Sequence, residues 1–121
     1  MLAANYPTVS GVILAGGLAR RMGGEDKGLV IFQGQPLIKH AINRLHPQVD
    51  HVIINANRNI DRYQQFGYTV VSDTLDDFQG PLAGMLSGMR HAKTDYILTA
   101  PCDGPLLSNK LRQRMNISFI A

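Results

Sequence analysis

The sequence lacks the patterns that mark several common classes of protein. Its single cysteine, Cys102, excludes an intramolecular disulfide, and its four histidines show no metal-ligand spacing, so no zinc site is indicated. No apolar run approaches the roughly 20 residues of a membrane span, and the N-terminus has no basic segment followed by an apolar core, the pattern of a signal peptide. We therefore expect a soluble, cytoplasmic protein with no membrane partner.

A strong excess of one charge is also absent. The formal net charge is only +3, and the basic residues are scattered, apart from Arg20-Arg21 and a few cations near the C-terminus. This pattern is typical of a solvated surface, so no nucleic-acid partner is expected. The chain has 121 residues, 45% hydrophobic and 17% charged, without repeats or low-complexity segments. These values predict one globular domain over residues 1–121.

What the sequence does contain is a glycine-rich, cationic stretch from Val12 to Lys27. An apolar run is followed by the glycine pair Gly16-Gly17, by Arg20-Arg21, and, after a second glycine pair, by Lys27. Glycines let backbone N–H groups approach phosphate oxygens closely, and the arginines and lysine supply positive charge. The stretch therefore suits a polyphosphate. It matches neither Gly-x-Gly-x-x-Gly nor Gly-Lys-Ser/Thr, which excludes the two commonest phosphate loops.

The rest of the chain alternates expected strands with expected helices. Short apolar runs predict strands over Val9–Ala15, Gly28–Phe32, Val49–Ala56, Tyr68–Ser72 and Tyr96–Pro101. Helices are expected from Pro36 to Leu45, from Ile60 to Phe66 and from Pro81 to Met89, with the methionines in the core, and Ser108 is expected to cap a further helix. This alternation predicts an α/β fold with a parallel sheet and helices on both of its faces.

Four positions that suit ligand binding fall at or just past the ends of separate expected strands. They are Gly16, Asn55, Asp73 and Asp103. Ligands of parallel α/β sheets bind outside the carboxyl ends of the strands, so these residues are expected to converge on one edge. Asp103 suits Mg²⁺, which favours one or two carboxylates together with substrate phosphates. The alternative is that Asp103 only caps a turn at Asp-Gly-Pro.

The remaining candidates complement that metal. Lys27 and Arg21 are expected to stabilise the transition state and the departing pyrophosphate, or else to be solvated charges. Asn55 and Asp73 offer hydrogen-bonding groups to a ribose or a base, and Asp73 can accept bonds from adjacent N–H donors such as those of guanine. From the residues alone, the chain is predicted to be a nucleotide-binding α/β domain that needs Mg²⁺.

The assembled motifs resemble those of one known family. The stretch Leu14-Ala-Gly-Gly-Leu-Ala-Arg-Arg-Met-Gly-Gly-Glu-Asp-Lys-Gly28 looks like the signature of the molybdenum cofactor guanylyltransferases (MobA-like proteins). Further matches are Val52-Ile-Ile-Asn-Ala-Asn-Arg58, Gly80-Pro-Leu-Ala-Gly84 and Pro101-Cys-Asp103, so the resemblance runs from about Val9 to Leu111. Relatives that transfer cytidylyl groups or activate sugar phosphates usually show Leu-Ala-Ala-Gly at the first motif, so the sequence favours the guanylyl branch.

The resemblance implies an enzyme with a Rossmann-like, three-layer α/β/α nucleotidyltransferase fold that transfers GMP from GTP to molybdenum-molybdopterin and releases pyrophosphate. It implies Mg²⁺ held by Asp103, catalytic roles for Arg21, Lys27 and Asp103, and no covalent catalyst. The residues that would bind GTP are Leu14, Ala15, Gly16, Gly17, Lys27, Asn55, Asp73 and Asp103. Molybdoenzymes or their chaperones are implied as further partners. The pattern does not distinguish a monomer from a homo-oligomer.

The sequence departs from the family after about Leu111. Similar proteins continue well past Pro101-Cys-Asp103 with strands and helices that help to bind the pterin, so we expect a C-terminally truncated fold that keeps the GTP half-site. Molybdopterin binding and turnover stay open. Two alternatives also stay open, a cytidylyl- or sugar-phosphate nucleotidyltransferase of the same fold and a truncated, non-catalytic nucleotide-binding module.

Overall fold

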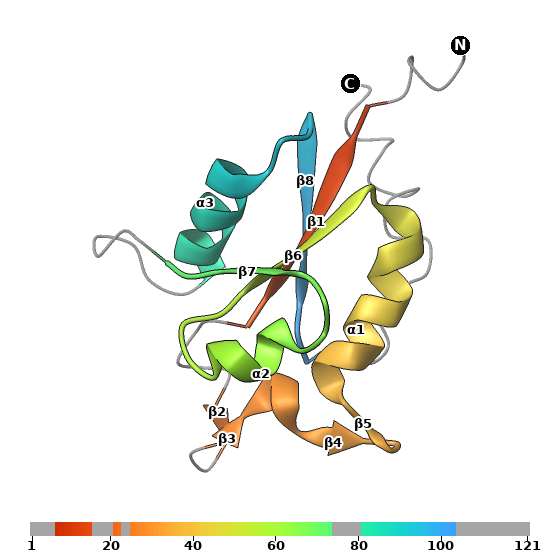
Figure 1. The fold of residues 1–121 in the computed structure, drawn as a ribbon, viewed down its shortest axis with the longest axis vertical. Helices are drawn as coiled ribbons and strands as arrows, with labels where there is room; N and C mark the ends of the chain where they lie inside the picture. The colour runs from red at the N-terminus through yellow and green to blue at the C-terminus, as the bar shows by residue number, and fades with distance from the viewer. Residues whose placement is uncertain (1–6, 16–20, 23–24, 74–80, 104–121) are drawn as a thin grey trace.

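A parallel, four-stranded sheet forms the centre of the molecule (Figure 1). The computed structural model describes residues 7–15, 21–22, 25–73 and 81–103. In spatial order the sheet consists of β7 (Thr69–Val71), β6 (His51–Asn55), β1 (Val9–Leu14) and β8 (Tyr96–Pro101). Every neighbouring pair runs parallel. The expected parallel sheet is therefore confirmed, and each of these strands lies within its expected range.

Helices cover both faces of this sheet. In Figure 1, α3 (Pro81–His91) and α1 (Leu37–Leu45) lie on opposite sides of the strands, and the short α2 (Ile60–Gln64) connects β6 to β7. The buried side chains of α1 recur at i, i+3, i+4 and i+7, the spacing of one helix face: Ile38, Ala41, Ile42 and Leu45. This arrangement confirms the three-layer α/β/α architecture.

The core has two parts because β1 is buried on both faces. Val9 and Ile13 pack in the cluster that contains the buried face of α1, whereas Val12 and Leu14 pack with Met85 of α3. A central parallel strand is buried on both faces, which explains why the sequence of β1 is mostly apolar and does not alternate with exposed polar residues.

The helix α3 packs closely on β1 through a glycine, and this contact can be tested. A Cβ atom added at Gly88 would lie 2.8 Å from both Cγ atoms of Val12. We expect Gly88→Ala to lower the free energy of unfolding by about 1–2 kcal/mol, because the strain outweighs the gain in helix propensity. Urea titration measures the change. Met89→Ala, on the exposed side of the same helix, should stay within about 0.5 kcal/mol of the wild type.

The expected strand over Gly28–Phe32 is wrong for most of its length. Residues Lys27–Leu29 form a 3-10 helix (η3), and only Ile31–Phe32 are extended, as β4. The side chain of Asp26 accepts a bond from the N–H of Gly28, so a local cap overrides the strand propensity. Strand β4 pairs antiparallel with β5 (Gln35–Pro36), outside the main sheet.

Smaller differences concern the connections. Pro36 is the N-cap of α1 rather than its first helical residue. A two-residue pair, β2 (Arg21–Met22) with β3 (Glu25–Asp26), lies within the expected phosphate loop, and a 3-10 helix η4 (His46–Gln48) follows α1.

The expectation that all the methionines of α3 lie in the core is wrong for Met89. Its side chain is 57% exposed, whereas Met85 packs against the core. The expected N-cap at Ser108 lies outside the described residues. In the part of the chain that the structure describes, no helix combines the length and apolar character needed to cross a membrane.

Candidate functional site

The carboxyl ends of all four central strands lie in one row. In the strand register, Leu14 of β1 is opposite Asn55 of β6 and Pro101 of β8, and Asn55 is opposite Val71 of β7. From β1 the chain builds β6 and β7 on one side, then returns to place β8 on the other. The strand order therefore reverses between β1 and β8, which is where a ligand crevice forms in such sheets.

Asn55 and Asp73 meet on the β6–β7 side of this row. The Nδ2 of Asn55 donates to the Asp73 carboxylate at 2.8 Å, and the Nδ2 of Asn57 donates to the other carboxylate oxygen at 2.8 Å. The backbone N–H of Asp73 in turn donates to the Oδ1 of Asn57 at 2.8 Å. Two amides thus orient one carboxylate at the edge of the sheet.

The amide of Asn55 is fixed from the helix side as well. Its side chain is buried, and a Cβ atom added at Gly84 of α3 would lie only 2.5 Å from its Oδ1. Gly84 thus allows the helix to approach the asparagine closely. The oxygen of Asn55 faces α3 and its nitrogen faces Asp73, so contacts within the protein fix the orientation of this amide.

Lys27 and Asp103 meet on the β8 side. The Nζ of Lys27 lies 3.4 Å from a carboxylate oxygen of Asp103, and the two side chains are 33% and 18% exposed. Lys27 begins η3, and Asp103 lies two residues past the end of β8. A cation and a carboxylate are therefore side by side next to the switch point, both accessible to solvent.

A buried carboxylate, that of Asp26, directly precedes Lys27 in the chain. Asp26 is buried, and the Tyr63 hydroxyl of α2 donates to its Oδ1 at 2.5 Å. The Nδ2 of Asn59 lies 3.4 Å from its other oxygen. Burial of the phenol, then its bond to the Asp26 carboxylate, raise the pKa of Tyr63 far above its usual value, so the hydroxyl stays protonated.

The structure brings together four of the predicted site residues in two pairs, Asn55 with Asp73 and Lys27 with Asp103. Leu14 and Ala15 lie at the end of β1 with buried side chains, and Leu14 accepts a backbone bond from Cys102 while Ala15 donates one to Asn55.

The other predicted residues are described in part or not at all. The backbone of Arg21 lies in β2, opposite Asp26, but its side chain is outside the description. Gly16 and Gly17 lie outside the described residues.

Sequence reasoning missed Asn57, Asp26, Tyr63 and Asn59. Asn57 stands two residues after Asn55 in the same motif, and that spacing was the available signal. Asp26 directly precedes Lys27, and nothing in the sequence marks this charged residue as buried. Tyr63 lies inside a short helix whose sequence carries no mark of a site.

The donor groups at this edge fit a magnesium ion that is shared with a substrate. Among residues 7–15, 21–22, 25–73 and 81–103, no group of three or more His, Cys, Asp or Glu side chains is arranged to hold a metal. Mg²⁺ does not need such a cage, because one or two carboxylates and substrate phosphates satisfy it. The accessible carboxylate of Asp103 matches that requirement.

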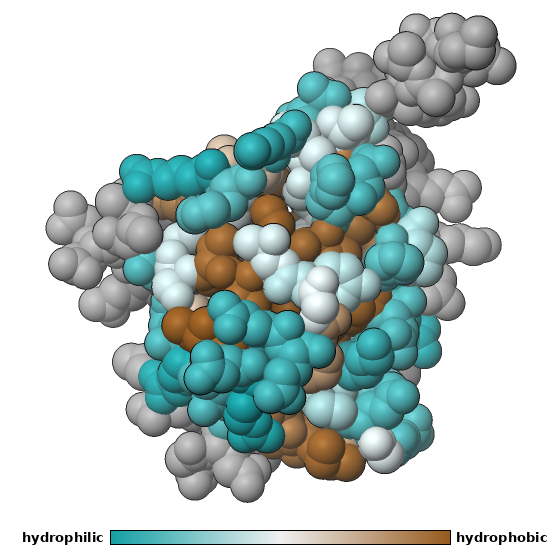
Figure 2. Space-filling view, viewed as in Figure 1, coloured by the Kyte–Doolittle hydropathy of each residue, from teal (hydrophilic) through white to brown (hydrophobic). Residues whose placement is uncertain are grey.

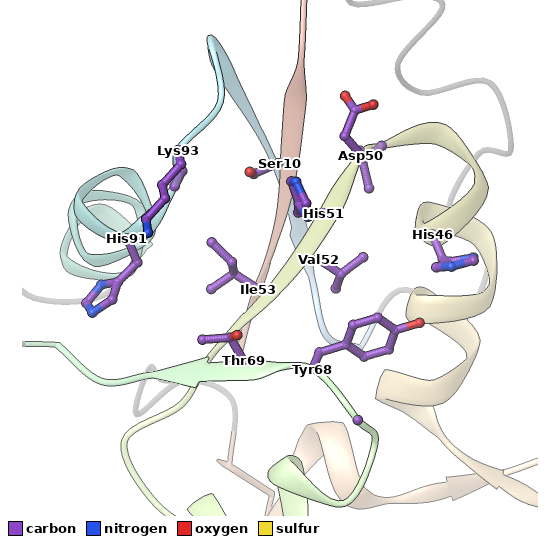
Figure 3. Close-up of a pocket in the computed structure, with 13 residues that line it drawn as sticks. Ser10, His46, Asp50, His51, Val52, Ile53, Tyr68, Thr69, His91 and Lys93 are labelled. Atoms are coloured by element: carbon purple, nitrogen blue, oxygen red, sulfur yellow. The ribbon is translucent and has the colours of Figure 1, made fainter.

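A hollow of about 460 Å³ opens at the opposite end of β6 (Figure 3). Its lining includes His51, Thr69, His91 and Lys93, and none of the predicted site residues. Figure 2 shows apolar residues gathered on this face between α3 and α1, with hydrophilic residues around them. The segments that follow α1 and α3 contribute to its lining, so it lies at the opposite end of the sheet from the predicted site.

Comparison with known proteins gives consistent matches. Residues 11–118 match the family described as "MobA-like NTP transferase domain". Over 115 residues the chain is 58% identical to a molybdenum cofactor guanylyltransferase of Shewanella loihica, covering 95% of this chain and 59% of that protein. It is 54% identical to one from Ralstonia nicotianae over 111 residues, or 92% and 54% of the two chains.

A solved structure agrees with these matches. A nucleotidyl transferase from Methanothermobacter superimposes with a TM-score of 0.69 at 28% identity, covering 88% of this chain and 56% of that one. The chain thus spans about half the length of the relatives that it matches.

Proposed function

Because the chain belongs to the family of MobA-like NTP transferase domains, we propose that it binds GTP at the carboxyl edge of its sheet and transfers GMP to molybdenum-molybdopterin. Pyrophosphate is the second product. The observation that carries the proposal is the Lys27–Asp103 pair beside the switch point, since it supplies a cation for phosphate and a carboxylate for a metal.

The two described pairs bind different parts of the nucleotide. Lys27 and Asp103 take the triphosphate end, with Arg21, Gly16 and Gly17 of the same loop as further phosphate contacts. Asn55 and Asp73 take the nucleoside end, where the ordered carboxylate of Asp73 accepts bonds from the adjacent N–H donors of guanine. Leu14 and Ala15 form the floor of the site at the end of β1.

The transfer itself needs no protein nucleophile. An oxygen of the terminal phosphate of molybdopterin attacks the α-phosphorus in line, the bond from that phosphorus to the bridging oxygen breaks, and pyrophosphate leaves with the electron pair. Lys27 donates hydrogen bonds to phosphate oxygens and stabilises the developing charge. Asp103 would hold Mg²⁺, which supplies charge neutralisation when it is bound.

Nucleotide selectivity tests the proposal against a cytidylyl or sugar-phosphate transferase of the same fold. We expect calorimetric titration in the presence of Mg²⁺ to give GTP an affinity at least about tenfold higher than CTP, ATP or UTP, since hydrogen bonds to a charged group are lost with the wrong base. Asp73→Asn should lower the ratio of the affinity for GTP to the affinities for CTP, ATP and UTP. Equal or tighter binding of CTP would contradict the guanylyl assignment.

A non-catalytic nucleotide-binding module is the second candidate. It needs only the ligand contacts that the two described pairs supply, Asn55 with Asp73 and Lys27 with Asp103. It gains support if the chain binds GTP but releases no pyrophosphate when it is given molybdenum-loaded molybdopterin. We further propose a cytoplasmic location, with molybdoenzymes or their chaperones receiving the product.

A further inference from the structure

Asp26 and Tyr63 form a buried polar pair that the proposed chemistry leaves without a role. Their side chains are 7% and 0% exposed. The Asp26 carboxylate accepts bonds from three groups, the Tyr63 hydroxyl at 2.5 Å, the Gly28 N–H at 3.3 Å and the Asn59 amide at 3.4 Å. A buried carboxylate is costly unless it is satisfied in this way, so the arrangement is a specific one.

The bond to Gly28 connects this pair to Lys27. Asp26 is the N-cap of η3, the single 3-10 turn that Lys27 begins. So short a turn has little stability of its own, and its position depends on the groups that hold it. Asp26 is held in turn by α2, through Tyr63. The orientation of the Lys27 backbone therefore depends on a hydroxyl group in another element.

The same turn packs directly on the end of β8. A Cβ atom added at Gly28 would lie 2.6 Å from the Tyr63 hydroxyl oxygen and 3.2 Å from the Sγ of Cys102. Gly28 and Cys102 are the chain neighbours of Lys27 and Asp103, whose side chains form the ion pair. The packing of Gly28 against Cys102 thus holds Lys27 close to Asp103.

We propose that the Tyr63 hydroxyl and the Asp26 carboxylate form a clamp that positions Lys27 against Asp103 for the triphosphate of the nucleotide. Tyr63 is a positioning residue in this scheme, because it acts through Asp26 and η3. The inference rests on the proposed function. It predicts that the clamp contributes to binding of the phosphates, whereas Asn55 and Asp73 contribute to binding of the nucleoside.

A substitution at Tyr63 can remove the hydroxyl group and keep the aromatic ring. The ring of Tyr63 lies in the core and near Phe66, with ring centroids 6.4 Å apart, and a phenylalanine would keep these contacts. Because the phenol stays protonated, it donates to Asp26 at every ordinary pH, and Tyr63→Phe removes that donor alone.

The experiment compares GTP with guanosine. We expect Tyr63→Phe to weaken Mg²⁺–GTP binding about tenfold, the scale of one hydrogen bond to a charged group, and to leave guanosine binding within about twofold. Tyr68→Phe, the same change in a residue that lines the hollow at the other edge, should alter neither affinity. General loosening of the fold would weaken both ligands equally, and that result, or unchanged GTP binding, would overturn the clamp.

Two further measurements sharpen the test, and the second of them does not depend on the proposed function. Asp26→Ala should lose as much GTP affinity as Tyr63→Phe, and the double variant should lose no more, because both changes break one connection. Hydrogen exchange of the Gly28 amide should accelerate at least about tenfold in Tyr63→Phe, while amides of β6 keep their rates. If the wild type binds no GTP, the proposed function fails, and unchanged exchange at Gly28 would then overturn the clamp.

Discussion

Replacing Lys27 with methionine should lower the rate of pyrophosphate release by about 100- to 1,000-fold, the effect of removing one donor that stabilises charge in a transition state. Methionine keeps the aliphatic part of the side chain, so the loss reports the ammonium group. The ion pair with Asp103 is partly exposed, and the free energy of unfolding should therefore change by no more than about 1 kcal/mol. A coupled pyrophosphate assay with loaded molybdopterin measures the rate.

Lys93→Met provides the matched control for this variant. Lys93 follows α3 and lines the hollow at the other edge of the sheet, so the same loss of charge there should leave the rate unchanged. Similar rates for Lys27→Met and the wild type would show that Lys27 is a surface charge and not part of the site.

Asp103→Asn should remove the dependence of GTP binding on Mg²⁺ and slow transfer by at least about 100-fold, because the metal supplies several kcal/mol of charge stabilisation. Asparagine has the shape of aspartate but lacks the negative charge that a hard cation prefers. Titration of GTP with and without Mg²⁺ measures the binding, and the pyrophosphate assay measures the rate.

The control for Asp103→Asn lies at the other end of the same strand. Asp95 precedes β8 and accepts bonds from the backbone N–H and the hydroxyl of Thr8, far from the row of strand ends. Asp95→Asn should keep the response to Mg²⁺ intact. If Asp103→Asn also kept it, the carboxylate would be a turn cap, which is the alternative interpretation of the Asp-Gly-Pro sequence.

Much of the fold could be predicted because the main elements have strong, regular patterns. Each central strand is a short apolar run between turn residues, and α1 shows the period of an amphipathic helix. The convergence of Asn55 with Asp73 followed from one rule about the carboxyl edges of parallel sheets. Lys27 was expected near Asp103 for another reason, as a charge that complements the metal.

The prediction was wrong where local hydrogen bonds or tertiary position decided the outcome. The apolar composition of residues 28–32 favoured a strand, but the Asp26 cap formed a 3-10 turn there instead. Met89 continued the helical spacing of α3, yet its side chain lies on the exposed side of that helix. Neither effect is visible in a pattern of residue types.

The buried part of the site could not be predicted for a different reason. Tyr63 and Asp26 are 37 residues apart, and nothing in either local sequence marks them as partners. A long-range polar contact depends on how elements pack, whereas periodicity describes one element at a time. Asn57 could have been predicted, because it stands two residues after Asn55 in the same motif.

The close approach of α3 to Asn55 has a consequence for protein engineering. Glycine in the middle of a helix is an obvious target for stabilisation by alanine, and Gly84 would be chosen on that ground. Its added methyl group would meet the oxygen of Asn55 and a methyl group of Leu14, at 2.5 and 2.8 Å. A change intended for thermostability would thus displace the amide of Asn55, which is proposed to contact the nucleoside, and Gly84→Ala is expected to lower nucleotide affinity as well as stability.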